Sequence, residues 1–586
     1  MYRKFTAQSR FENLRKEAKH WLKSLRAGDS AAKERLRRAW PEAPAQPGLR
    51  DIQHALAREY GLASWAMLKE KLEEMAFAQK NREEQVAEFL EDACLHYGVR
   101  PGTSTWDQSY FDEPSRWAHA ARLLAKYPEI AEHSIHTAAV SGNLSGVKRI
   151  LSERPAAATQ KGGPMGWEPL LYVCYGRLAI PAVREHSAAI ARLLLDAGAN
   201  VKAPMYDGAH DFWPLTGAIG AGEFSQPTHP QAVELAGLLI ERGANPYDPQ
   251  TLYNTSLEGD DLFWLDFLYE RSARLQQTDL WTAPAPPSTW PDAGMLTYLL
   301  GNAVTRNAIT RARWQLERGA DPSGRHFYTK RKLHTEAVLL GFTEMANLLL
   351  SFGAVAEPLN GHNAFQVACL RLDRDGAATM AREHPEYLLN ATPLIQAAGR
   401  DLLEVATLLL DLGMSPDVSD PTNFRPLHAA ASGDAVRVGA LLIERGAEID
   451  PRETRFNGPP LGWALYGKQQ RMIAMLGALS RSTRQLVRMG NLTRLRELFA
   501  SDPEMAKEIT ESDSLFFYLP DNEDLAIEIA ELLLANGADP SIKNKEGLTA
   551  IEYAEKQGLT SVADLLSSHA HSGSRVPPLG NDGVQP

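Results

Sequence analysis

A pair of closely spaced histidines is the first feature of the sequence that could do chemistry. His133 and His136 stand three positions apart in the segment "HSIH". Imidazole nitrogens are common zinc ligands, but a zinc site takes at least three ligands from the protein. No further pair of histidines or cysteines stands close by in the sequence. We therefore predict no metal site, and nothing in the sequence indicates another cofactor.

Catalytic motifs are not found either. Hydrolysis and group transfer need a nucleophile with a base, or paired carboxylates in a pocket. The sequence contains no Gly-rich phosphate loop, no G-x-S-x-G and no H-E-x-x-H. The acidic clusters "EGDD" from 258 and "DNED" from 521 fall in turns or at helix starts, where carboxylates stabilise the helix dipole. We predict that the protein is not an enzyme, and an activity hidden in the insertions described below ranks as the third alternative.

The three cysteines offer no cross-link. Cys94, Cys174 and Cys369 lie far apart in the sequence, which fits neither a disulfide framework nor zinc spacing. We expect them to be buried free thiols.

Aromatic side chains in turns are the stronger functional signal. They occur in "MYDGAHDFW" (205–213), "GRHFYTK" (324–330), "DPTNFR" (420–425) and "RETRFN" (452–457), where no hydrophobic core demands them. Aromatic and arginine anchors dominate protein interfaces, although each ring could equally pack over its own loop. The candidate partner-binding residues are Tyr206, Phe212, Trp213, Phe327, Tyr328, Phe424, Arg425 and Phe456.

Charge divides the chain unevenly. Residues 1–80 contain 17 Lys and Arg against 10 Asp and Glu, a net charge of +7, whereas the whole chain carries -11. Phosphate binding needs clustered cations, so the acidic remainder argues against general nucleic-acid binding and leaves the question open for the N-terminal part. There, "ALAREYGLASWAMLKEKL" resembles the spacing of a helix-turn-helix. The alternative is that residues 1–80 cap the rest of the chain and display a solvated basic face.

A repeated phrase shows which elements must position the aromatic turns. It occurs as "LLLDAGAN" (193–200), "LLIERGAN" (238–245), "WQLERGAD" (314–321), "LLLSFGAV" (348–355), "LLLDLGMS" (408–415), "LLIERGAE" (441–448) and "LLLANGAD" (532–539). The period is 34 residues from Gly319 to Gly353 and 33 from Gly413 to Gly446. In "RPLHAAASGDAVRVGALLIERGAEID", Pro426 suits the first turn of a helix, and we expect Gly433 and Gly446 to end the two helices in the left-handed conformation.

These features resemble the ankyrin repeat. "PLHAA" at 426–430 and "TPLIQAA" at 392–398 are similar to the ankyrin opening Thr-Pro-Leu-His-x-Ala, with Arg425 and Ile395 departing from it. The resemblance implies an all-α solenoid of about 12 repeats between residues 115 and 570. It also implies turn fingers that project into a concave groove and bind proteins. His136 and His428 would then be hydrogen-bonded within their repeats.

The chain also has irregular parts. We predict a basic helical head at 1–80, a connecting helix and loop at 81–114, repeats at 115–357 and 358–570, and a disordered tail at 571–586. The head resembles a small helical domain found before bacterial ankyrin arrays. Insertions near 176–188, 220–231 and 276–294 interrupt the first half of the array, and the first two should lie side by side.

The function predicted from the sequence is that of a protein-binding scaffold or adaptor that uses the concave face. The alternative is a nucleic-acid-associated regulator that uses the basic head, with the array as protein adaptor. The start "MYRKFTAQSR" has no apolar secretory region, and no apolar run reaches the roughly 18 residues of a membrane span. We expect a cytoplasmic protein with no membrane contact, and the sequence does not identify its protein partner.

Overall fold

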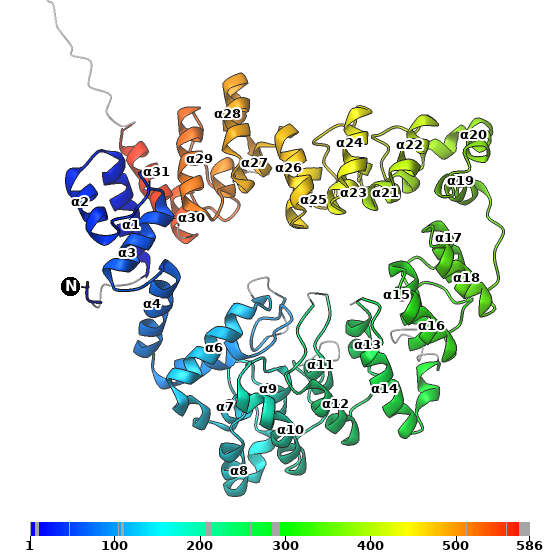
Figure 1. Ribbon diagram of the computed structural model, residues 1–586, viewed down its shortest axis with the longest axis horizontal. Helices are drawn as coiled ribbons and strands as arrows, with labels where there is room; N and C mark the ends of the chain where they lie inside the picture. The colour runs from blue at the N-terminus through cyan, green and yellow to red at the C-terminus, as the bar shows by residue number, and fades with distance from the viewer. Residues whose placement is uncertain are drawn as a thin grey trace, which may run out of the picture. The chain divides into compact units, whose positions relative to one another are not determined.

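The computed structural model describes residues 2–5, 11–45, 47–103, 105–106, 110–206, 212–223, 225–257, 259–283, 294–510, 513–557 and 559–572. These residues form 31 α-helices, several short 3-10 turns and one two-stranded antiparallel ribbon (Figure 1). The chain divides into two compact units. Unit 1 consists of residues 1–73 and 359–586, and unit 2 consists of residues 74–358.

Unit 1 begins with the helical head, whose core is made by one apolar face from each helix. Asp29 caps the second head helix by accepting a hydrogen bond from the backbone N–H of Ala31 at 2.8 Å. Trp21 and Leu56 are almost fully buried between the helices. The head helices are α1 (Phe11–Arg26), α2 (Ser30–Ala39), α3 (Leu49–Glu59) and the first part of α4 (Trp65–Gln79).

The rest of unit 1 is a stack of helix pairs in which each pair packs on the next. The pairs are α19 (Gly361–Leu370) and α20 (Arg374–Glu383), α21 (Thr392–Gly399) and α22 (Leu403–Asp411), α23 (Pro426–Ser432) and α24 (Val436–Glu444), α25 (Pro460–Tyr466) and α26 (Gln470–Leu479), α27 (Thr483–Met489) and α28 (Leu492–Ser501), and α30 (Ala550–Lys556) and α31 (Thr560–Ser572). In one further pair, α29 (Glu523–Ala535) follows the 3-10 turn η7 (Leu515–Tyr518), and β1 (Ile509–Thr510) pairs with β2 (Asp513–Ser514) before that turn. The turns η5 (Pro385–Leu389) and η6 (Pro503–Lys507) follow α20 and α28.

Unit 2 has the same construction. It contains α5 (Arg82–Ala93), α6 (Pro114–Lys126), α7 (Ile135–Val140), α8 (Leu144–Glu153), α9 (Pro169–Tyr175), α10 (Pro181–Asp196), α11 (Pro214–Ile219), α12 (Ala232–Glu241), α13 (Pro249–Ser256), α14 (Phe263–Arg274), α15 (Met295–Arg306), α16 (Ile309–Glu317), α17 (Leu333–Leu339) and α18 (Thr343–Ser351). The turns η2 (Pro128–Glu132), η3 (Pro155–Thr159) and η4 (Thr278–Trp281) join some of them. The predicted all-α, helical-repeat fold class is therefore confirmed.

The repeat of α23 and α24 shows why the sequence folds this way. Leu427, Ala430 and Leu442 are at most 1% exposed and face the neighbouring pairs. A single pair could not bury these side chains alone, so stacking completes the core.

The glycine after α23 corrects one expectation. Gly433 has a φ of -91°, and the left-handed residue is Asp434, with a φ of 52°. Gly433 is required because a Cβ there would collide with the carbonyl oxygen of Gly399 in the preceding repeat. Gly446 does take the expected left-handed conformation, with a φ of 89°.

The predicted insertions are partly regular structure. The segment 176–188 is helical from Pro181 onward, because the proline starts α10 four residues after Arg177. The described residues of 220–231 form a loop, as expected, and the carbonyl of Pro227 in it accepts a hydrogen bond from Arg177 of the first segment, which confirms that the two lie side by side. The third, 276–294, contains η4, and its residues 284–293 lie outside the described ranges, as do residues 573–586 of the predicted tail.

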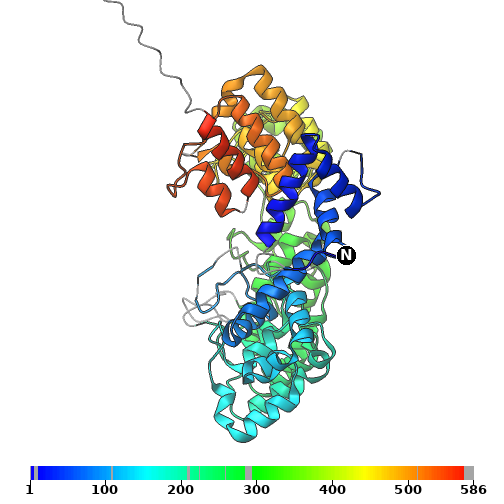
Figure 2. The same cartoon turned by 90° about the vertical axis from the view of Figure 1, so that its left-hand side faces the viewer.

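Within unit 1 the head packs against the last repeat. Helix α1 lies beside α31 in both views (Figure 1, Figure 2). The carboxylate of Glu523, at the start of α29, is 2% exposed and forms ion pairs with Lys19 and, at 3.1 Å, with Arg15 of α1. It also accepts the backbone N–H of Ser561 at 2.8 Å, so one carboxylate connects α1, α29 and α31. The head thus covers the end of the repeat stack.

Candidate protein-binding surface

Two turn fingers precede α23 and α25 in unit 1, and in each of them a carboxylate accepts hydrogen bonds from the backbone of the turn. Asp420 accepts the backbone N–H groups of Thr422 and Phe424 at 2.8 and 3.0 Å. Burial by itself would raise the pKa of Asp420, but these hydrogen bonds outweigh it and lower the pKa below its usual value. Glu453, which is buried, accepts the backbone N–H of Phe456 at 2.9 Å in the second finger. Hydrogen bonds inside each finger therefore hold both turns in a defined conformation.

The two fingers are also tied to each other. The backbone N–H of Thr454 donates to the carbonyl of Thr422 at 2.8 Å. His428 accepts the N–H of Arg425 on Nδ1 at 3.1 Å, and its Nε2 donates to the carbonyls of Pro451 and Gly458. The local hydrogen bonding expected for His428 is confirmed, and His136 likewise bonds the carbonyl of Gln160 at 2.7 Å. A partner would therefore meet a surface that needs little ordering.

A continuous set of rings lies on this frame, which we call the aromatic surface: Phe424, Phe456, Trp463 and Tyr466. Phe424 stacks on His428 with ring centroids 5.2 Å apart and meets the edge of Trp463 at 5.2 Å. Phe456 also meets the ring of Trp463, with centroids 5.8 Å apart, and is 71% exposed. Tyr466 follows Trp463 by three residues, so it shares a face of α25, and it is 86% exposed.

Cationic side chains continue this surface on the next helix. Arg484 and Arg488 of α27, which packs against α25, place their guanidinium carbons 4.5 and 5.8 Å from the ring centroid of Tyr518. Arg488 is exposed. Arg425, the predicted arginine anchor, is instead half-buried and forms ion pairs with Asp417 at 3.1 Å and Glu448 at 2.7 Å.

The predicted residues of unit 2 divide into two groups. Tyr328 is 64% exposed, beside Phe327, whose half-buried ring meets Tyr298 at 5.7 Å and the Lys330 ammonium at 4.4 Å. Tyr206, Phe212 and Trp213 are half-buried.

The second group packs within its own part of unit 2. The ring of Phe212 packs on Tyr97 at 4.9 Å, and burial raises the pKa of Tyr206. Residues 207–211 lie outside the described residues. The ring of Phe212 thus packs on a residue more than 100 positions earlier in the chain as well as lying near Tyr206, and the use of these rings in partner binding stays a prediction.

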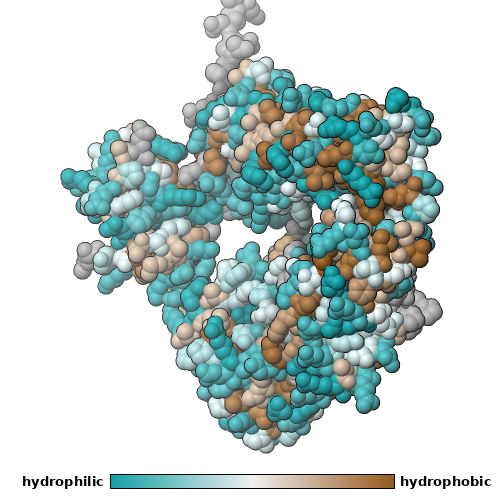
Figure 3. Space-filling model, turned by 45° about the vertical axis from the view of Figure 1, so that its right-hand side comes forward, coloured by the Kyte–Doolittle hydropathy of each residue, from teal (hydrophilic) through white to brown (hydrophobic). Residues whose placement is uncertain are grey.

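Sequence reasoning missed Trp463 and Tyr466 because they lie on an inner helix and not in a finger. A signal was present. "PLGWALYG" at 460–467 aligns with "PLHAAASG" at 426–433, so Trp463 replaces Ala429 and Tyr466 replaces Ser432. The rings of Trp463 and Tyr466 thus stand where the preceding repeat has small residues, whereas the rings at the same positions of "PLLYVCYG" (169–176), Tyr172 and Tyr175, are fully buried. In the space-filling view, apolar side chains form several patches on the repeats of unit 1, separated by hydrophilic residues (Figure 3).

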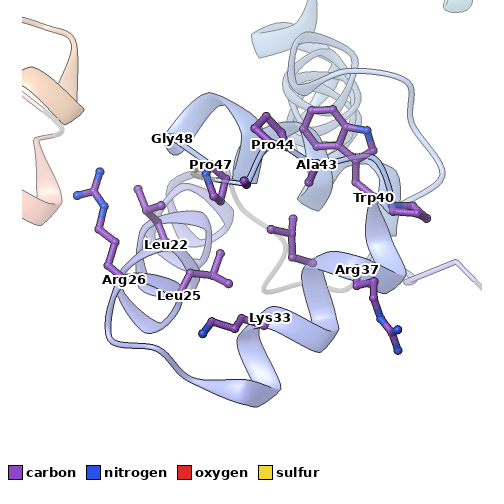
Figure 4. A pocket seen from close by; sticks show the side chains of 13 residues that line it. Leu22, Leu25, Arg26, Lys33, Arg37, Trp40, Ala43, Pro44, Pro47 and Gly48 are labelled. Carbon is purple, nitrogen blue, oxygen red and sulfur yellow. The ribbon is translucent and has the colours of Figure 1, made fainter.

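The head contains a separate hollow of about 630 Å³ between α1, α2 and the loop that leads to α3. Figure 4 shows Leu22 and Leu25 pointing into it below Pro44 and Pro47, with Lys33 along one wall. Arg37 points away from the hollow in this view and pairs with Glu34 at 2.8 Å. The hollow is therefore lined by apolar side chains together with the cations Arg26, Lys33 and Arg37.

Comparison with known proteins gives little beyond the fold. No protein-family model and no curated protein matches the chain. Among solved structures, the chain is similar to an ankyrin repeat domain from Acinetobacter baumannii AYE, with 19% identity over 31% of this chain and 99% of that chain, at a TM-score of 0.25. No helix within the described residues is long and apolar enough to cross a membrane.

Proposed function

We propose that the chain is a protein-binding scaffold and that its partner docks on the aromatic surface of unit 1. The observation that carries this proposal is the exposure of Phe456, whose ring contacts the half-buried Trp463, and of Tyr466, three residues after Trp463 on the same helix. Exposed rings next to a packed ring give a partner both apolar area and a defined position, and aromatic residues supply most binding hot spots.

The charges around the surface define the partner further. Arg484 and Arg488 lie on the helix next to Trp463, and Lys468 is exposed at the end of α25. A segment with an apolar or aromatic anchor followed by acidic residues would place the anchor against Trp463 and its carboxylates beside α27. Electrostatic complementarity of this kind fixes orientation and raises the association rate.

The test is a random peptide library displayed on phage and selected against the full chain. We expect the selected peptides to combine an aromatic residue with acidic residues. Replacing Trp463 or Tyr466 by alanine should weaken binding of these peptides by about 30-fold or more, because truncation of a hot spot costs about 2 kcal/mol or more. Affinities measured by fluorescence anisotropy would check this.

The matched control is Tyr328→Ala, which removes a comparably exposed finger ring from unit 2 and should leave these affinities unchanged. Tyr466→Ala guards against a folding effect, because its side chain is almost fully exposed. Unchanged affinity in both the Trp463→Ala and Tyr466→Ala chains would refute the proposed surface.

The second candidate function is nucleic-acid association through the head. It is supported by Lys33, Arg37 and Arg38, three exposed cations within six residues on α2. Replacing these three residues by glutamine should reduce binding of a short DNA duplex. The slope of the logarithm of affinity against the logarithm of salt concentration should become shallower by about one unit for each lost phosphate contact. Electrophoretic mobility shifts at several salt concentrations would measure this, and binding with no salt dependence would exclude it.

A further inference from the structure

A cluster of three side chains with metal-binding groups lies at the beginning of unit 2. Glu88 and Asp92 are four residues apart on α5 and therefore share one face of that helix. His119 comes from α6, which packs against α5. One ligand atom from each residue lies within 4.8 Å of the other two, and all three residues are half-buried. Nδ1 of His119 lies 2.8 Å from an oxygen of Asp92.

The neighbouring cations leave room for a metal ion. Lys80 pairs with Glu88, but its ammonium lies at the end of an exposed, flexible side chain that can move away at little cost. Arg116 is 3.9 Å from Asp92 and is held there by its 2.6 Å hydrogen bond to the carbonyl oxygen of Cys94. Its guanidinium therefore stays outside the cluster and compensates charge without occupying a ligand position.

The type of ligand selects the type of ion. Magnesium and calcium prefer sites made of oxygen atoms alone, and soft ions prefer thiolates. One imidazole with two carboxylates suits zinc, which takes nitrogen and oxygen ligands with tetrahedral geometry. The thiol of Cys94 is not among the groups whose ligand atoms converge there.

We propose that Glu88, Asp92 and His119 bind a zinc ion, with water in the fourth position. The ion would join α5 to α6 directly before α7 and α8. Its effect would be to clamp the N-terminal edge of the helix stack in unit 2, which is a role separate from partner binding by unit 1.

The test is zinc titration of the full, metal-free chain by calorimetry, with amide hydrogen exchange as the structural readout. We expect one-to-one binding. At a free zinc concentration about 100 times the dissociation constant, local opening of α5 and α6 should become roughly 100-fold rarer and exchange correspondingly slower. A chain that binds no zinc, or binds magnesium as tightly as zinc, would overturn the assignment.

Variants identify the ligands. His119→Ala and Glu88→Gln should each weaken zinc binding by more than about tenfold, since even indirect partners of a metal site cost 10–100-fold. Glu88→Gln keeps the size of this half-buried side chain, so the fold should persist, which circular dichroism would check. The control is His133→Ala, which removes an exposed histidine of the same unit whose Nε2 lies 3.4 Å from Glu83. Zinc affinity that survives His119→Ala would place the ion elsewhere and refute the site.

Discussion

Replacing Glu523 by alanine should destabilise the docking of the head on the last repeat by about 3–5 kcal/mol, which is the usual cost of breaking a buried ion pair by removing one partner. Lys19 is 8% exposed, and its ammonium would lose the carboxylate that faces it. The backbone N–H of Ser561 would lose its acceptor at the same time. Hydrogen exchange should therefore speed up by at least about 100-fold in both α1 and α31, at roughly tenfold per 1.4 kcal/mol.

The control is Glu531→Ala, which removes an exposed carboxylate from the same helix, α29, and should change stability by no more than about 0.5 kcal/mol. The informative result is whether hydrogen exchange speeds up together in α1 and α31, which are far apart in the sequence. If α31 lost protection while α1 kept it, the head would be held by its other contacts, and Glu523 would not be the residue that fastens it to the last repeat.

The repeat fold could be predicted because its signals are local. Pro426 and Leu427 start a helix, Gly446 stops the next one, and the phrase returns after 33 or 34 residues, so each unit repeats the same argument. The expectation that the structure corrected at Gly433 depends on a contact that forms only when neighbouring repeats stack. The sequence cannot show that Gly433 is needed for close approach to Gly399, because that contact forms only between repeats.

Sites assembled from distant residues could not be predicted. Glu523 stood in an acidic cluster that was interpreted as a helix start, and its ion pairs come from residues about 500 positions earlier. His119 stands 27 residues after Asp92, without the short spacing that marks a zinc motif. Eight candidate aromatic and arginine residues were named from turns, and the fold brings only Phe424 and Phe456 against Trp463.

Replacing Arg177 by methionine should lower the free energy of unfolding of unit 2 by about 4 kcal/mol, since several buried carbonyls lose a charged donor. Arg177 is 5% exposed and lies in a segment that was predicted to be an insertion. Its guanidinium donates to the carbonyls of Cys174, Gly176, Gly217 and Pro227 at 2.5–3.1 Å. Burial lowers its pKa to about 10, which still leaves it charged at neutral pH.

Methionine keeps much of the side-chain volume, so the loss would report the hydrogen bonds more than a cavity. The free energy of unfolding of the Arg177→Lys chain should fall between those of the unchanged chain and of Arg177→Met. A lysine ammonium still donates up to three hydrogen bonds, but it lacks the planar, forked geometry of the guanidinium. Arg184→Ala, at an exposed arginine of α10, is the control and should be nearly neutral. Urea unfolding would measure stability, and hydrogen exchange in the loop 220–231 would locate the damage. Because Arg177 donates to the carbonyl of Pro227 in the loop, we expect the loop amides to lose protection before the helices of unit 2 do. An unchanged loop in Arg177→Met would show that its other contacts, such as the hydrogen bond from Tyr97 to the carbonyl of Ala221, hold it.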